Sequence, residues 1–476
     1  MKFLGRFPRR GLSSVTVIRH HWNRSTLRGP ASREGSRRRL LTSYAPVRPQ
    51  VDACLCPPSP SAESTRFRLL ALLQLLLFTF VVRPLSHLWP KDARLVAFIP
   101  REGSRYIDNV GHFHAQLTRL GLLPRGAYLL VTDPQLAESW TARGRTARPY
   151  RPFSPSGLLL YLRTSVVIAD SWHWARDGRY AFFCGAKKVQ VWHGIPLKKI
   201  ELSNLEGARA LGLRRPLKTL QYWAQGRYPC YDLLVSTSQF FRKHAFEPSF
   251  RSRRFVDTGY PRNDLLLSEP AEPLSIDSDD PTLQALTDLK AQGKRVVVYA
   301  PTFRDTGGGP FEDAVLSYAD LHRFARENGL VVVLKLHPYL ATSPPTLHWP
   351  DLMAYDSAKD AAPLLKLADA LVTDYSSIYF DFLLLDRPVV FFPYDFSKYR
   401  HHDRSFLFDY DELTPGPKAL DRSTLFSTLL TELNAPDPHW RAQRHLLTQK
   451  SFTYPDGNAS LRLWTEIEAL IRRTRR

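Results

Sequence analysis

From residue 94 onward, short runs of Val, Ile and Leu alternate with longer segments in which apolar residues recur at helical spacing. This alternation is typical of parallel β-sheets that helices cover on both faces. One set of predicted strands lies at residues 94–99, 127–132, 166–169, 188–192, 232–236 and 255–258, and a second set at 295–300, 330–336, 352–355, 370–373 and 388–392. The two sets predict an α/β protein in which two doubly wound, Rossmann-like domains face a cleft.

Two segments before residue 91 differ from this pattern. Residues 1–66 are rich in Arg, Ser and Pro and have scattered apolar residues, so we expect a disordered basic extension. Residues 67–90 contain an uncharged run of 14 residues, 69–82, which is shorter than the ~20 residues of a spanning helix. Because basic residues flank this run, we expect a membrane-associating helix on an anionic cytoplasmic leaflet. A true membrane span and a plain buried helix are the alternatives.

A polar, Pro-rich segment separates the two sets of strands and predicts a linker. The chain exceeds the usual size of a single hydrophobic core, which agrees with two domains. The predicted division is therefore a basic extension at 1–66, an apolar helix at 67–90, an N-terminal domain at 91–270, the linker at 271–292 and a C-terminal domain at 293–476.

The formal net charge of +21 indicates an anionic partner, which could be nucleic acid, anionic lipid or a phosphorylated substrate. Residues 1–66 hold 13 Lys or Arg against 3 Asp or Glu, so about half of the excess lies in the basic extension. A protein that binds nucleic acid or an anionic surface through this extension is one alternative, and it predicts salt-dependent DNA binding. Because the extension is separable from the core that carries the motifs, we expect no specific nucleic-acid partner.

The four cysteines are too few and too irregularly spaced for a disulfide framework or a zinc ribbon, which indicates a reducing compartment. The sequence also lacks the Walker A loop, the G-x-G-x-x-G fingerprint and the G-x-S-x-G elbow. We therefore expect no metal held by the protein and no cofactor. A need for Mg²⁺ brought in by a diphosphate substrate stays open.

Polar motifs follow five of the predicted strands, namely V-W-H-G-I-P-L-K-K, T-G-Y-P-R-N-D, Y-A-P-T-F-R-D, L-K-L-H-P and V-T-D-Y-S-S. A single His or Ser in such a place is usually structural, for example as a helix cap. Five motifs in succession are harder to explain in this way, because the carboxyl ends of parallel strands share the edge of a sheet where ligands bind. The pattern predicts a site for a phosphorylated ligand in the cleft.

Two of these motifs combine imidazoles with cations. His193 is followed by Gly194, which lets the backbone approach a ligand, and by Lys198, so His193 is the candidate base for a hydroxyl beside phosphates. His337, next to Lys335, is the candidate to stabilise a transferring phosphoryl group or its leaving group.

Two further motifs offer phosphate ligands. Arg304, two residues after Thr302, has a planar fork that matches phosphate oxygens. Two hydroxyls near a predicted helix start could bind a phosphate or cap the helix, and they belong to Ser376 and Ser377. Asp374 and Asp381 are expected to orient a partner or a ribose hydroxyl, because carboxylate and phosphate repel each other.

The motifs stand in a fixed order as W-H-G-x-P-L-K (192–198), G-Y-P-R-N-D (259–264), Y-A-P-T-F-R-D (299–305), K-L-H-P (335–338), D-Y-S-S-I-x-F-D-F (374–382), R-P-V-V-F-F-P-Y-D (387–395) and P-G-P (415–417). This series resembles the CDP-glycerol glycerophosphotransferase family, whose members prime or polymerise teichoic acids. The resemblance covers roughly residues 90–450.

The resemblance implies a GT-B fold, with the acceptor on the N-terminal domain and the nucleotide donor on the C-terminal domain. It implies transfer of glycerol phosphate from CDP-glycerol to a hydroxyl of a lipid-linked, glycan or polyol-phosphate acceptor, with release of CMP, at the cytoplasmic face of the cell membrane. It also places the two motif histidines of the family at His193 and His337. The segment that follows Tyr399 and Arg400, H-H-D-R-S-F-L-F, departs from the family pattern. A CDP-ribitol or nucleotide-sugar transferase is therefore the alternative.

Overall fold

The computed structural model describes residues 73–474, apart from 177, 207–225, 227, 270–279, 337–346, 348 and 404. The predicted basic extension, the first part of the predicted linker and His337 therefore lie outside the described residues.

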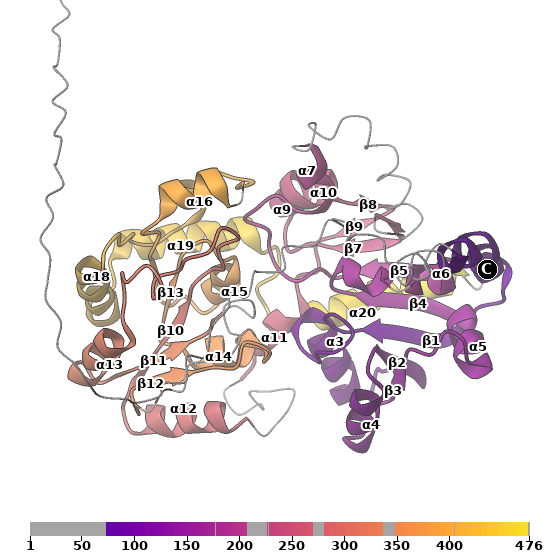
Figure 1. The fold of residues 1–476 in the computed structure, drawn as a ribbon, viewed down its shortest axis with the longest axis horizontal. Coiled ribbons are helices and arrows are strands. Elements are labelled where there is room, and N and C mark those ends of the chain that lie inside the picture. Colours follow the sequence, from indigo (N-terminus) through magenta and orange to yellow (C-terminus); the bar gives the residue numbers. More distant parts are fainter. Residues whose placement is uncertain are drawn as a thin grey trace, which may run out of the picture. The chain divides into compact units, whose positions relative to one another are not determined.

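The N-terminal part contains a parallel sheet of seven strands in the order β3-β2-β1-β4-β5-β7-β9 (Figure 1). Every residue of β4 is buried, as expected for a central strand that is covered on both faces. The strands are β1 (Asp92–Ile99), β2 (Gly126–Val131), β3 (Ala147–Pro149), β4 (Thr164–Ala169), β5 (Lys187–Gln190), β7 (Leu233–Val235) and β9 (Phe255–Val256), and a separate pair comprises β6 (Cys230–Tyr231) and β8 (Arg251–Ser252). The six predicted strands are confirmed. The sequence did not predict β3, β6 and β8, which have at most three residues each.

Helices connect these strands. Ser154 and Asp133 cap two of them, since each side chain accepts a hydrogen bond from an amide of the first turn. The helices of this part are α3 (Asp108–Arg119), α4 (Pro134–Ala142), α5 (Pro155–Arg163), η2 (Trp172–Ala175), α6 (Arg179–Phe183), α7 (Glu201–Glu206), α9 (Gln239–Phe241), η4 (Arg242–Phe246), α10 (Glu247–Ser249) and α11 (Pro261–Leu267).

The C-terminal part contains a second parallel sheet, in the order β12-β11-β10-β13-β14. All five predicted strands are confirmed, as β10 (Arg295–Ala300), β11 (Leu330–Leu334), β12 (Leu352–Ala354), β13 (Ala370–Thr373) and β14 (Val389–Phe391). The helices that follow α11 are α12 (Pro281–Ala291), α13 (Tyr318–Glu327), α14 (Ala361–Leu367), α15 (Ile378–Leu383), α16 (Phe396–His402), α17 (Tyr410–Leu413), α18 (Arg422–Asn434), α19 (Pro438–Ser451) and α20 (Ala459–Thr474).

The structure corrects the predicted linker at 271–292, because its second half is helix α12. Asp280 caps this helix by accepting a hydrogen bond from the amide of Thr282. Leu283 and Leu286, three residues apart, are buried in the core. The prediction of a linker rested on the Pro-rich sequence before residue 281 and overlooked this apolar spacing.

The structure also corrects the C-terminal limit of the second domain, because α20 packs on the N-terminal part. In Figure 1, α20 lies beside α3. The ring of Trp464 lies 6.5 Å from that of Phe113 in α3. The carboxylate of Asp264 accepts hydrogen bonds from the first amides of α20, at 2.8 and 2.9 Å. The apolar face of α20 is thus buried against a domain that precedes it by about 200 residues.

The apolar segment predicted at 67–90 is partly packed and partly exposed. Its described part is helical from residue 73 to residue 88 and includes η1 (Phe78–Val82) and α2 (Arg83–Leu88). Phe78 is buried, and its ring packs edge-on against Phe182 at 5.1 Å. The opposite side of the segment exposes Leu73, Leu76, Leu77, Phe80, Val81 and Leu88. Among the helices that the structure describes, none has the length and apolar character needed to cross a membrane.

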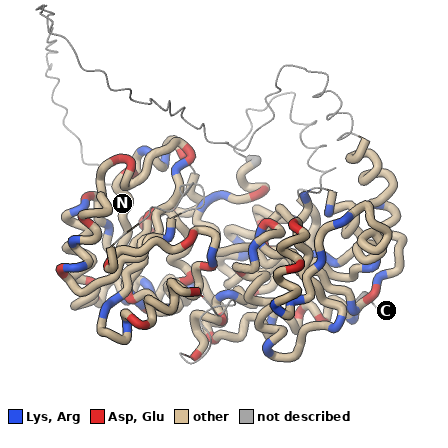
Figure 2. Tube along the Cα trace, turned by 60° about the horizontal axis from the view of Figure 1, so that its bottom comes forward, with Lys and Arg blue, Asp and Glu red and all other residues tan. Residues whose placement is uncertain are grey.

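Lys and Arg lie among Asp and Glu along the described trace rather than in one stripe (Figure 2). Many of them form ion pairs, such as Arg422 with Asp320 at 2.5 Å.

Candidate active site

Several residues of the candidate site follow strands at, or next to, the point where the strand order of each sheet reverses. In the first sheet the order reverses between β1 and β4, which are followed by Arg101 and Asp170, and β5 is followed by His193. In the second sheet it reverses between β10 and β13, which are followed by Thr302 and Asp374. Ligands of doubly wound sheets bind at such switch points.

A cavity of about 430 Å³ brings residues of both sheets together. This volume suits a small-molecule ligand. Seven of the predicted site residues line it, namely His193, Gly194, Lys198, Thr302, Lys335, Ser376 and Ser377.

A second cavity, of about 400 Å³, adjoins the first. Its lining includes Arg101, Arg105, Asp108, Lys359, Asp360 and Asp381. His193, Ser376 and Ser377 line both cavities, so the imidazole of His193 stands at their shared wall.

The hydrogen bond of His193 fixes its tautomer. Its Nδ1 lies 2.9 Å from the backbone oxygen of Asp170. Because a carbonyl oxygen can only accept, Nδ1 carries the proton and Nε2 has a lone pair. Burial, reinforced by the nearby charge of Arg101, lowers the pKa of His193 to about 3. The imidazole is therefore neutral at neutral pH and can accept a proton at Nε2.

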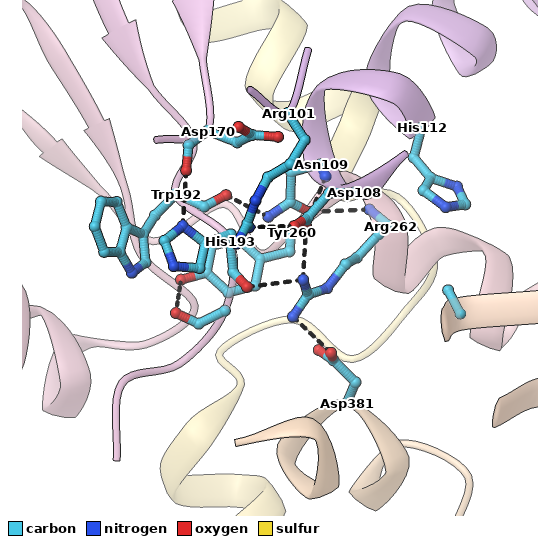
Figure 3. Close-up of polar contacts among 12 residues, drawn as sticks. Arg101, Asp108, Asn109, His112, Asp170, Trp192, His193, Tyr260, Arg262 and Asp381 are labelled. Carbon is cyan, nitrogen blue, oxygen red and sulfur yellow. Dashed lines mark hydrogen bonds and ion pairs between the residues drawn. The ribbon is translucent and has the colours of Figure 1, made fainter. Parts of the chain in front are cut away.

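Side chains hold the backbone on both sides of this imidazole (Figure 3). The contacts are Trp192 N to Gln190 Oε1 (2.9 Å), Asn109 Nδ2 to Trp192 O (2.8 Å), Arg262 Nη1 to His193 O (2.9 Å) and Tyr260 Oη to Gly194 O (3.1 Å). Trp192 has a φ of 48° and Gly194 a φ of 141°, values that side chains disfavour. The backbone of this loop is therefore strained, and several hydrogen bonds hold it in that conformation, as is typical of functional sites.

Asn109, Tyr260 and Arg262 are functional candidates that sequence reasoning missed. A signal was present for two of them, since Tyr260 and Arg262 stand in the G-Y-P-R-N-D motif. Their side-chain partners are far away in sequence, so the motif alone did not assign them a role.

Arg304 does not lie in the cavity as expected for a phosphate ligand. Its side chain is 0% exposed. Its Nε and Nη2 donate to Asp395 at 3.0 and 2.9 Å, and its Nη1 donates to Asp374 at 2.7 Å and to the backbone oxygen of Thr302. These contacts make Arg304 the centre of a buried ion-pair network beneath the cavity.

Asp374 belongs to the same network rather than to the cavity lining. Its carboxylate accepts hydrogen bonds from the amides of Thr302 and Tyr375, at 2.8 and 2.5 Å. The carboxylate thus ties the ends of β10 and β13 together.

The two serines after Asp374 differ in their contacts. Ser376 Oγ accepts a hydrogen bond from the amide of Ile378 at 3.3 Å, whereas Ser377 Oγ forms no cap of α15.

Two of the lysines that line the first cavity, Lys198 and Lys335, have defined partners. Lys335 donates to three backbone carbonyls, those of Asp356, Ser357 and Lys359, at 2.9–3.1 Å. Burial lowers the pKa of Lys335 to about 8, so its ammonium stays mostly charged at neutral pH. The Nζ of Lys198 lies 5.0 Å from the ring centroid of Tyr399. Both lysines place positive charge at the cavity.

Together these features define a cleft between two parallel sheets in which a neutral histidine lies beside lysines and hydroxyls, an arrangement that suits a phosphorylated ligand. Over residues 81–469 the chain matches the family described as CDP-Glycerol:Poly(glycerophosphate) glycerophosphotransferase. It belongs to this family, as its motifs indicated.

Curated relatives include the teichoic acid glycerol-phosphate transferase of Staphylococcus aureus, which is 31% identical over 280 residues, or 58% of this chain and 69% of that protein. The teichoic acid poly(glycerol phosphate) polymerase of Bacillus subtilis is 28% identical over 314 residues, or 61% of this chain and 39% of the polymerase. The chain therefore spans well under half of the length of that polymerase.

Among solved structures, the chain is similar to the wall teichoic acid polymerase TagF, with a TM-score of 0.64 and 20% identity. The match covers 87% of this chain and 98% of that one. At this identity the likeness concerns the fold, and it agrees with the predicted arrangement of two Rossmann-like domains.

Proposed function

We propose that the protein transfers glycerol phosphate from CDP-glycerol to a hydroxyl acceptor in teichoic-acid-like polymer synthesis, with release of CMP. Family membership supports the reaction class. The observation that carries the mechanism is the neutral His193, which stands at the wall shared by two cavities.

Phosphoryl transfer needs the attacking and leaving oxygens on opposite sides of phosphorus. CMP would lie in the first cavity, where Lys198 and Lys335 place positive charge beside the diphosphate. The acceptor would lie in the second cavity, where the side chains of Arg105 and Lys359 can meet its phosphate and Asp360 its polyol hydroxyls. The reacting phosphorus would then lie at the shared wall, near Ser377.

In this arrangement Nε2 of His193 takes the proton of the acceptor hydroxyl. The acceptor oxygen forms a bond to the phosphorus that carries glycerol, and the bond from this phosphorus to the bridging oxygen breaks. The electron pair stays with that oxygen, and CMP leaves as an anion that needs no proton. His337 is retained as a second candidate for stabilising the leaving group, and it lies outside the described residues.

The donor is tested by incubating the full chain with CDP-glycerol and a lipid or glycan that ends in a glycerol phosphate, and by measuring CMP. A parallel reaction with CDP-ribitol is informative, because the relatives include a teichoic acid poly(ribitol-phosphate) polymerase that is 30% identical over 209 residues. We expect CMP only when both substrates are present, and faster release from CDP-glycerol. Protein treated with EDTA is assayed with and without added Mg²⁺. Release from CDP-ribitol alone would overturn the glycerol assignment.

The exposed apolar side of η1 and α2 supports a place at the cytoplasmic membrane surface. Replacing Phe80 and Val81 together by Ser is expected to lower binding to phosphatidylglycerol vesicles at least tenfold, because each apolar side chain contributes about 1.5–3 kcal/mol when it is fully buried. Vesicle co-sedimentation measures this change. Leu446→Ser, at an exposed position of α19, is the control and should bind as the unmodified protein does. Unchanged binding of the double variant would remove this segment from the membrane contact.

A further inference from the structure

We infer that Arg262 is a positioning residue that couples the donor side of the cleft to the catalytic base. Its Nη1 donates to the backbone oxygen of His193 at 2.9 Å and to Asp108 at 2.7 Å. Its Nη2 donates to Asp381 at 2.6 Å. The inference rests on the proposed role of His193 as the base.

The three partners of Arg262 come from different parts of the molecule (Figure 3). Asp108 begins α3 and His193 follows β5, both in the N-terminal part, whereas Asp381 lies on α15 of the C-terminal part. The Arg262 side chain is 13% exposed, and those of Asp108 and Asp381 are 11% and 8% exposed. Charge-assisted hydrogen bonds of a guanidinium fork in such a setting are geometrically strict.

The guanidinium of Arg262 can lie directly against the loop because the residue after His193 is a glycine. A Cβ at Gly194 would lie 3.0 Å from Nη2 of Arg262, so the missing side chain lets the guanidinium lie against the loop. Asn109 and Tyr260 also hold the loop, but both belong to the N-terminal part. Of the described side chains that bond the backbone at 192–194, Arg262 is the one that also bonds a residue of the C-terminal part, Asp381.

The helix that carries Asp381 also follows Ser376 and Ser377 directly. A shift of α15 would therefore move Arg262 and, through it, the carbonyl of His193. We therefore expect His193 to be correctly placed for catalysis only when α15 lies in the position that keeps Asp381 bonded to Arg262. A misplacement of about 1 Å is enough to reduce a rate about 100-fold.

Asp381→Asn tests the coupling, because it keeps the shape of the side chain and removes its charge. We expect kcat for CMP release to fall about 100-fold, while the Kd for CDP-glycerol, from calorimetry, changes less than about threefold. Arg262→Lys should give a similar split, since an ammonium lacks the fork that reaches all three acceptors. Glu466→Gln is the matched control: it removes a carboxylate that pairs with Arg254 at 2.8 Å away from the loop, and it should keep normal activity.

A second readout needs no turnover. In the free protein, Asp381→Asn should speed hydrogen–deuterium exchange of amides at 191–195 relative to Glu466→Gln, because the loop loses its anchor. Because Asp381 also lines the second cavity, the KM for the acceptor is measured as well. A weaker affinity for CDP-glycerol or a higher acceptor KM, with unchanged kcat, would mean that Asp381 contacts a substrate, and it would overturn the inference. Normal kcat and normal exchange in Asp381→Asn would overturn it as well, while the proposed function would stand. If the unmodified protein released no CMP, the proposed function would fail, and the exchange difference would still decide whether α15 anchors the loop.

Discussion

Replacing His193 by Gln is expected to lower kcat for CMP release by about 10²–10⁴-fold, the usual contribution of a general base. Gln can still donate a hydrogen bond to the oxygen of Asp170, so the loop keeps its anchor. It cannot take a proton from the acceptor at neutral pH. The rate is measured at saturating CDP-glycerol and acceptor. His244→Gln is the control, because His244 also bonds a backbone oxygen through Nδ1, at 2.9 Å, but lies exposed on η4.

The pH dependence of the unmodified protein tests the same role. The base works in its neutral form, and burial lowers the pKa of His193 to about 3. Acidification from pH 8 to pH 5 therefore leaves this imidazole neutral, and kcat/KM should lose little through its protonation over that range. Activity would fall only as the pH approaches the lowered pKa. A half-maximal rate near pH 6.5, with the fold intact by circular dichroism, would assign the base to an ordinary exposed histidine.

Replacing Arg304 by Gln is expected to lower the free energy of unfolding by about 3–5 kcal/mol. The substitution leaves the carboxylates of Asp374 and Asp395 buried without the cation that both contact. The shift of the urea midpoint, followed by fluorescence, measures this loss.

An exposed ion pair provides the control for Arg304. Arg422→Gln breaks the pair with Asp320, in which the arginine is 52% exposed, and should cost less than about 1 kcal/mol. If Arg304→Gln kept its stability and only raised the KM for CDP-glycerol, Arg304 would be a phosphate ligand, as the sequence first indicated.

Much of the fold could be predicted because runs of Val and Ile mark buried parallel strands. The roles of individual polar residues were harder to predict, since a motif states which side chain is present and not what it contacts. Arg304 suits a phosphate or two carboxylates equally well, and the structure pairs it with the carboxylates of Asp374 and Asp395. The part played by Arg262 depends on Asp381, which is 119 positions away in the sequence.

The return of α20 to the N-terminal part has a consequence for the order of folding during synthesis. Asp264 and Phe113 meet their partners only after residues 459–474 have left the ribosome. At about 5–20 residues per second, the roughly 190 residues between α11 and α20 take about 10–40 s to make. During that interval the nascent N-terminal domain exposes the apolar surface that α20 later covers. The packing of the N-terminal domain therefore cannot be completed until α20 has been made.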